Sequence, residues 1–205
     1  MPVSVPPAME MEEFSCLHPQ QDFLVYMNHM ILKRTSTCPP VFAFTTLTGQ
    51  LIASAEQEMQ CGCHVYSTSE EQLWLDSNAR LVLGVKEEER GVLSTRRSCV
   101  VRSPNTQVIG RVVLKTTRGQ QNNSIQDNDY RPLVRFERRA PMFHSMVTSF
   151  KLPDGQEIAC MKHKQNGARV LMEFSETCSV DLKILIMAAA ILYQRRDLAT
   201  KGKVV

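Results

Sequence analysis

Basic residues gather in two segments of the chain, and their chemistry suits the binding of an anion. Residues 131–139 carry four arginines around a short apolar run, and residues 162–169 carry two lysines and an arginine around a Gln-Asn-Gly turn sequence. Arginine presents a fork of donors to a phosphate group, and lysine presents a compact charge. We expect the two segments to lie on adjacent strands and to form an anion pocket. The candidate binding residues are Arg135, Arg138, Arg139, Lys162, Lys164 and Arg169.

The same cations also fit the ordinary charged exterior of a sheet. Val112 and Leu114 share one face of an expected strand, while Arg111 and Lys115 share the other face. The formal net charge is only +3, which argues against a polybasic binder of nucleic acid. Anion binding is therefore expected to be local to a pocket, with no nucleic-acid partner.

Other motifs that carry chemistry are weak in this sequence. Cys61, Cys63 and His64 offer zinc-binding groups, but the Cys-x-Cys spacing is short for a zinc site and no second pair follows at finger distance. Cys99 and His144 offer a nucleophile and a base, yet no nucleophile elbow, phosphate-binding loop or dinucleotide fingerprint accompanies them. The sequence predicts a protein that is not an enzyme and holds no metal or cofactor.

The cysteines indicate a reducing compartment. The chain contains seven cysteines, an odd number, and they are spread along its length. The sequence opens without the charged and apolar pattern of a signal peptide. We therefore expect reduced thiols, many of them buried, in a cytoplasmic protein. A peripheral position at the plasma membrane and a nuclear one are the alternatives.

The elements that must position these residues are mostly strands joined by tight turns. Short apolar runs alternate with turn sequences rich in Gly, Asn, Asp and Pro, which is typical of an antiparallel meander or barrel. The four expected strand pairs are 41–46 with 51–55, 72–75 with 80–83, 99–102 with 108–114, and 143–151 with 156–161. The polar stretch 116–129, rich in Gln and Asn, is predicted to be a long mobile loop.

One helix follows the strands, at about residues 180–196. Ser179 suits the N-cap, Asp181 suits the first turn, and two arginines suit the last turn. Residues 184–193 are apolar without interruption, so the helix has no polar face and must be buried. The run is shorter than the roughly 20 residues of a membrane span, which favours burial in protein. The alternative is a tail anchor in a thin membrane, which Lys183 disfavours.

At these residues the chain resembles the tubby C-terminal-like superfamily, which contains tubby domains, phospholipid scramblases and plant LURP-one-related proteins. Residues 181–192, Asp-Leu-Lys-Ile-Leu-Ile-Met-Ala-Ala-Ala-Ile-Leu, are similar to the closing helix of scramblases and LURP-one proteins. Residues 48–53, Thr-Gly-Gln-Leu-Ile-Ala, and 154–159, Asp-Gly-Gln-Glu-Ile-Ala, are similar to the repeated Gly-Gln hairpins of those families.

The resemblance implies a mainly β domain, a closed antiparallel β-barrel that encloses a hydrophobic C-terminal helix. That domain would cover residues 22–198, with its core helix at about 180–196. Residues 1–21, which are rich in proline, would form a flexible lead-in, and residues 199–205 would form a tail.

The resemblance also implies a function, although this sequence lacks several features of the families. It implies a non-enzymatic domain that binds anionic phospholipid, a phosphoinositide, peripherally through basic residues on the barrel. The segment before the helix offers Glu173, Glu176 and Asp181, but not the dense aspartates or the turn glycine of a calcium loop. The scramblase cysteine cluster and the basic motif of tubby domains have no clear counterpart. The alternatives are a protein-interaction adaptor that uses residues 116–129 or the proline-rich N-terminal segment, and a scramblase-like lipid translocator.

Overall fold

The protein is mainly β, with one long helix after all the strands. The computed structural model describes residues 24–37, 40–57, 70–75, 79–91, 94–103, 107–118, 120–139, 146–163 and 169–201. The helix is α1 (Val180–Lys201). The strands are β1 (His29–Thr37), β2 (Pro40–Thr45), β3 (Leu51–Gln57), β4 (Glu70–Leu75), β5 (Ala79–Gly91), β6 (Ser94–Arg102), β7 (Val108–Thr117), β8 (Gln120–Gln121), β9 (Asn123–Gln126), β10 (Pro132–Arg139), β11 (Val147–Lys151), β12 (Glu157–His163) and β13 (Arg169–Phe174).

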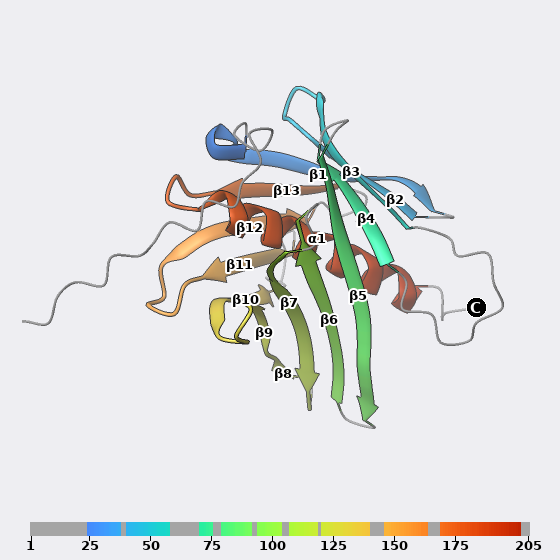
Figure 1. The fold of residues 1–205 in the computed structure, drawn as a ribbon, viewed down its shortest axis with the longest axis vertical. Helices are drawn as coiled ribbons and strands as arrows, with labels where there is room; N and C mark the ends of the chain where they lie inside the picture. Colours follow the sequence, from blue (N-terminus) through green and yellow to red (C-terminus); the bar gives the residue numbers. More distant parts are fainter. Residues whose placement is uncertain are drawn as a thin grey trace, which may run out of the picture.

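All the strands belong to one antiparallel sheet. Its order is β6-β5-β4-β3-β2-β1-β13-β12-β11-β10-β9-β7-β8, and β6 pairs in addition with β7. The β6–β7 ladder runs from the pair Ser94 and Thr117 to the pair Arg102 and Val108. Figure 1 shows α1 running between the β11–β13 side of the sheet and the β5–β7 side. The predicted class, antiparallel β with one hydrophobic helix, is therefore confirmed.

The four expected hairpins are present, because the local turn chemistry specifies them. They are the pairs β2–β3, β4–β5, β6–β7 and β11–β12. In the β2–β3 turn, Gly49 has a φ of 94°, and in the β11–β12 turn Gly155 has a φ of 90°. Only glycine adopts this backbone region without steric cost, so each Gly-Gln sequence marks a turn and the start of the next strand.

The prediction of a long loop at residues 116–129 is wrong. This stretch forms β8 and β9, joined to the end of β7 by a turn. The reason is that its polar side chains find partners inside the protein. The side-chain nitrogen Nδ2 of Asn123 donates to Tyr193 Oη over 2.8 Å, and the side-chain oxygen Oδ1 of Asn123 accepts the Lys115 N–H over 3.1 Å. Ile125 is fully buried beside them.

The core lies between α1 and the inner face of the sheet. Residues 184–193 are all buried, none more than 2% exposed. Large side chains from the strands pack around them, among them Phe42, Phe44 and Phe150. Gly110 on β7 leaves room for the helix: a Cβ there would lie 2.9 Å from a Leu185 methyl group and 2.9 Å from the Gln126 carbonyl oxygen. Because the helix is apolar on every side, burial by the sheet is what stabilises it.

The start of α1 is fixed by a cap and by a buried lysine. The Ser179 hydroxyl accepts the Leu182 N–H over 3.4 Å, which confirms the predicted N-cap. Lys183, 1% exposed, donates from Nζ to the carbonyl oxygens of Leu24 and Val25 over 2.8 and 3.0 Å. The residues before β1 are thereby tied to the helix. Burial lowers the pKa of Lys183, because it disfavours the charged ammonium.

The helix ends later than predicted, at Lys201 instead of residue 196. The added residues, Asp-Leu-Ala-Thr-Lys, contain no helix breaker, and the first glycine after them is Gly202. Glycine is the residue most often found just beyond a helix end, so the helix continues until that signal.

Candidate functional site

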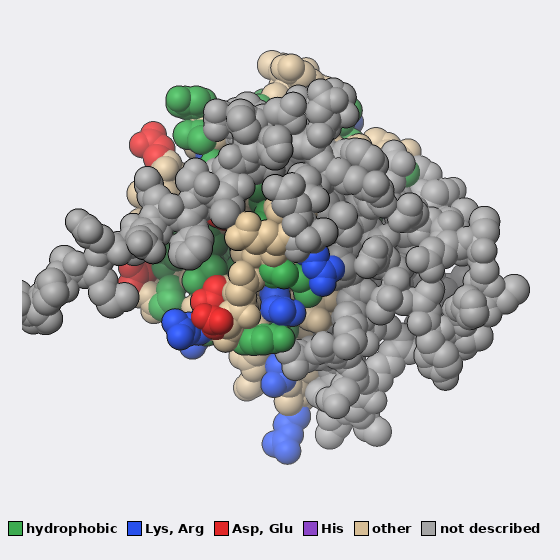
Figure 2. All heavy atoms as spheres, in the orientation of Figure 1, with side chains coloured by type: hydrophobic (Ala, Val, Ile, Leu, Met, Phe, Trp, Pro, Cys, Tyr) green, Lys and Arg blue, Asp and Glu red, His purple; other side chains and the backbone are tan. Residues whose placement is uncertain are grey.

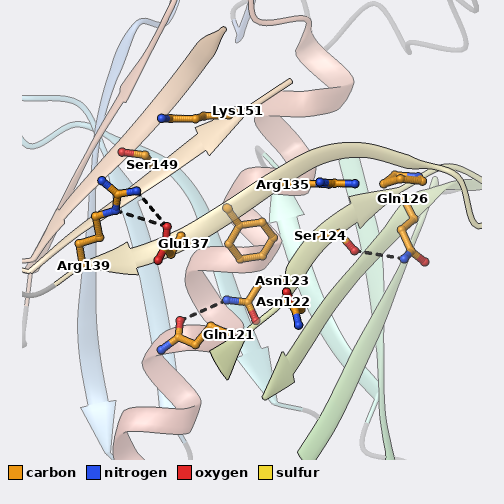
Figure 3. Close-up of a pocket in the computed structure, with 12 residues that line it drawn as sticks. Gln121, Asn122, Asn123, Ser124, Gln126, Arg135, Glu137, Arg139, Ser149 and Lys151 are labelled. Atoms are coloured by element: carbon orange, nitrogen blue, oxygen red, sulfur yellow. Dashed lines mark hydrogen bonds and ion pairs between the residues drawn. The ribbon is translucent and has the colours of Figure 1, made fainter. Parts of the chain in front are cut away.

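A polar pocket of about 570 Å³ opens over strands β9, β10 and β11. Figure 3 shows the side chains that line it, and Figure 2 shows Lys and Arg side chains gathered over this part of the surface beside acidic ones. The lining residues are Gln121, Asn122, Asn123, Ser124, Gln126, Pro132, Arg135, Phe136, Glu137, Arg139, Ser149 and Lys151.

Strand alternation explains why basic residues reach this pocket. Along β10 the residues alternate between exposed and buried, with Val134 and Phe136 buried and Arg135 and Glu137 exposed. Side chains two apart share a face, so Arg135, Glu137 and Arg139 all point outward. The same rule brings Ser149 and Lys151 outward from β11.

The pocket carries an excess of positive charge. Three basic side chains and one carboxylate line it, giving a formal net charge of +2. The carboxylate, Glu137, already accepts from Arg139 Nη2 over 3.1 Å and from Nε over 3.3 Å. Neither Arg135 nor Lys151 has an ion-pair partner among the residues that the structure describes.

Arg135 and Lys151 are directly opposite each other in the β10–β11 ladder. Like charges at directly opposed positions destabilise a sheet. An anion bound between them would remove this repulsion, and the surrounding amides and hydroxyls would supply further donors. Figure 3 shows Arg135 extending toward Gln126, whose Nε2 donates to Ser124 Oγ over 3.1 Å.

Only some of the binding residues predicted from the sequence lie together in the pocket. Arg135 and Arg139 lie in the pocket. Arg138 lies on the opposite face of β10, where its guanidinium carbon is 5.5 Å from the centre of the Tyr193 ring. Arg169 is exposed at the start of β13, opposite Lys33 of β1, and lies outside the pocket. Lys164 lies outside the described residues.

Lys162 points outward from β12, where it forms an ion pair with Glu173. The ammonium donates to both carboxylate oxygens, over 2.8 and 2.6 Å. This contact raises the pKa of Lys162 and lowers the pKa of Glu173. The Cys160 thiol also donates to Glu173, over 3.2 Å. Burial, followed by that hydrogen bond, raises the pKa of Cys160 to about 11, so the thiol stays protonated at neutral pH.

Sequence reasoning missed Lys151 and the amides of β8 and β9. Lys151 is an isolated lysine before a Leu-Pro-Asp-Gly turn, and nothing local distinguishes it from a solvated strand end. Its position beside Arg135 follows from the register of two strands. The amide-rich stretch was visible in the sequence, but it was interpreted as a loop.

The metal and membrane expectations bear on only part of the chain. Within the described ranges, no group of three or more His, Cys, Asp or Glu side chains is placed to hold a metal ion. The Cys61, Cys63 and His64 motif lies outside those ranges. No helix within those ranges has the length and apolar character needed to cross a membrane. Cys99 and Cys178 are buried, and Cys160 is partly exposed.

Comparisons with known proteins give little beyond this geometry. No protein-family model matches the chain, and no curated protein matches it. Among solved structures, an X-ray structure of the Arabidopsis thaliana protein AT5G01750 is similar, with a TM-score of 0.47 and 15% sequence identity. The match covers 82% of this chain and 92% of that chain. A likeness of this strength carries no argument about function.

Proposed function

We propose that this protein binds the headgroup of an anionic membrane phospholipid, a phosphoinositide, in the pocket on β9–β11. The observation that carries the proposal is the opposed pair Arg135 and Lys151, two cations without a counter-charge among the described residues. A phosphate between them would accept a forked contact from arginine and a point contact from lysine. Binding would be peripheral, and the protein would act as a recognition module without catalysis.

The size and chemistry of the pocket agree with a headgroup carrying several phosphates. A volume of about 570 Å³ falls within the range of small-molecule sites. Arg139 sits at the far end of the same face, and its pair with Glu137 is exposed to solvent. An exposed ion pair is weak, so a phosphate can displace the carboxylate at small cost.

We also infer that the sheet closes into a barrel of the tubby C-terminal-like type around α1. The inference is supported by the β6–β7 ladder, which pairs the first strand of the order with the last but one, and by α1, which is buried along residues 184–193. Closure removes exposed strand edges and gives the outer face a continuous wall, on which a rigid pocket can form. Slow amide exchange in both β6 and β7 would support closure, and fast exchange along the facing edges would contradict it.

Vesicle binding tests the proposed function. Purified protein is sedimented with phosphatidylcholine vesicles that contain or lack a phosphoinositide, at low and at physiological salt. We expect binding that requires the phosphoinositide and weakens with salt, because exposed charges are screened. The double variant Arg135→Ala, Lys151→Ala should lose most of this binding.

The sheet offers a matched control for this variant. Lys33 and Arg169 form another directly opposed Lys and Arg pair, on β1 and β13, outside the pocket. The double variant Lys33→Ala, Arg169→Ala removes the same net charge and should bind nearly as the unmodified protein does. Equal loss in both double variants would mean that binding follows net charge, and the pocket would be rejected as the site.

A further inference from the structure

The large hydrophobic side chains that remain exposed are not scattered over the surface. Six such side chains are exposed among the described residues, from 36% for Leu133 to 86% for Tyr26. They belong to three separate segments: the turn before β1, the β2–β3 turn with the first residue of β3, and the β9–β10 connection with the start of β10. The six are Val25, Tyr26, Leu47, Leu51, Tyr130 and Leu133.

These three segments lie at one end of the sheet, the end where α1 begins. The residues before β1 meet the end of β13, where Phe174 N–H donates to the Asn28 carbonyl over 2.8 Å. β2 runs antiparallel to β1, so the β2–β3 turn is at the β1 start, and the pair Thr45 and Leu51 closes that ladder. The same antiparallel alternation through β12 and β11 places the β9–β10 connection at this end. We call it the α1-entry end.

The pocket reaches the same end. Arg135 lies near the start of β10 and Lys151 ends β11, so the opposed cations are the charged residues of the pocket nearest the α1-entry end. Leu133 is two residues before Arg135 on the same strand and projects from the same face. Figure 2 shows hydrophobic side chains projecting at the upper left, in the region where Figure 1 places the chain before β1.

Two of the six exposed hydrophobic side chains, Leu47 and Tyr130, stand on turns that are fixed by local contacts. Leu47 sits in a turn closed by Thr46 N–H to the Gln50 carbonyl over 2.9 Å and by a 2.8 Å hydroxyl pair between Thr46 and Thr48. Tyr130 adopts a φ of 64°, and the Arg111 guanidinium lies 4.4 Å from the centre of its ring. A non-glycine residue in this backbone region is held there by its surroundings. Displaying an apolar side chain on a fixed turn lowers the ordering cost of inserting it elsewhere.

We propose that the α1-entry end docks on a lipid bilayer and inserts these apolar side chains into its interfacial layer while a headgroup occupies the pocket. The inference rests on the proposed function and adds an orientation and an apolar contribution to it. A protein partner would need a contiguous patch of roughly 800 Å². The tips instead stand on three turns separated by polar residues, an arrangement that a fluid lipid surface accommodates. Tyrosine is enriched at the interface of bilayers, and interfacial binding adds apolar burial to electrostatic attraction.

The first test compares vesicle binding of a Leu47→Ser, Leu51→Ser variant with that of the unmodified protein and of Arg135→Ala, Lys151→Ala. Both leucines are about 60% exposed, so the variant should keep the unmodified melting temperature. We expect roughly tenfold weaker binding to phosphoinositide vesicles at every salt concentration, because the lost contribution is apolar. The charge variant should instead flatten the salt dependence.

A second measurement reports insertion directly. Leu47→Trp should be quenched by brominated lipid in phosphoinositide vesicles, whereas Gln120→Trp, on the exposed β7–β8 side at the opposite end, should not. Both substitutions are made together with Trp74→Phe, so that the introduced tryptophan is the only one in the chain. Quenching of both, or of neither while the protein is bound, would overturn the proposed orientation.

The outcomes separate this inference from the function on which it rests. Unmodified protein that fails to bind phosphoinositide vesicles would overturn both. Binding that requires Arg135 and Lys151 but is unchanged by the leucine variant would overturn only the insertion. A concentration-dependent dimer in solution that the leucine variant abolishes would assign the α1-entry end to a second copy of the chain and overturn the bilayer as its occupant.

Discussion

Strand β10 places arginines in two opposite environments. Arg138 points inward and lies over the Tyr193 ring of the buried helix. Arg135 and Arg139 point outward into the pocket, and Arg135 faces Lys151 across the ladder. The inner face contributes packing, so changes there should alter stability. The outer face contributes uncompensated charge, so changes there should alter binding and leave stability nearly unchanged.

The largest expected effect comes from the inner face of this strand. The Phe136 ring is stacked on Phe150 at 4.8 Å between ring centres and meets the Tyr193 ring edge-on at 5.9 Å. We expect Phe136→Ala to lower the free energy of unfolding by about 3–5 kcal/mol, measured by urea denaturation. Its neighbour on the outer face is the control: Arg135→Ala should change stability by no more than about 0.5 kcal/mol. Similar losses in both variants would break the comparison between the faces.

Lys183 tests whether an interior cation is structural. Lys183→Met keeps the apolar stem and removes the ammonium donor from the Leu24 and Val25 carbonyl oxygens, of which Leu24 keeps the Met27 N–H over 3.2 Å. We expect a loss of about 1–3 kcal/mol in the free energy of unfolding, because buried acceptors without partners are costly. Lys33, on the outer face of β1, supplies the matched variant Lys33→Met, for which we expect little change. A Lys183→Met protein as stable as the original would show that its hydrogen bonds only offset the cost of burying the charge.

The buried thiol of Cys178 should make the free energy of unfolding depend on pH in the alkaline range. Burial raises the pKa of this thiol from 9.0 to about 11. Between these values the unfolded chain releases the thiol proton while the folded protein retains it, so stability falls as pH rises from about 9 to about 11. The contribution is on the order of 1–2 kcal/mol. Unfolding curves of Cys178→Ala over this range should fall less steeply than those of the original protein; parallel curves would contradict the assignment.

The smallest expected effect is on the outer face at Lys162. Its ammonium contacts both Glu173 carboxylate oxygens, over 2.8 and 2.6 Å, in a pair that is less exposed than Arg139–Glu137, and it lies outside the pocket. We expect Lys162→Ala to bind phosphoinositide vesicles as the unmodified protein does, and Glu173→Gln to bind slightly more tightly because it releases the lysine. Weaker binding by Lys162→Ala would mean that the binding site extends from β11 to β12 and is not confined to the outer face around β10.

The sequence predicted the elements that local chemistry specifies. Uninterrupted apolar residues identified the buried helix, and Gly-Gln and Pro-Asp-Gly turns identified the hairpins. The polar β8–β9 segment was misinterpreted because Asn123 is satisfied by Tyr193, a residue far along the chain. Strand alternation could have predicted the inward orientation of Arg138, because residues two apart share a face and Arg138 follows the apolar Val134 and Phe136 at this spacing. The pairing of Arg135 with Lys151 depends on register between strands, which a single sequence does not reveal.

The order of elements along the chain has a consequence for how the molecule is made. The helix that fills the sheet comes after the thirteen strands of the described ranges. During synthesis the strands leave the ribosome first, with their inner apolar faces lacking the segment that later covers them. Lys183 then joins the helix to carbonyl groups near the first strand, across a separation of 159 residues. Such distant contacts slow folding and leave apolar surface exposed meanwhile. We therefore expect the strands to be prone to aggregation until synthesis of the helix completes the fold.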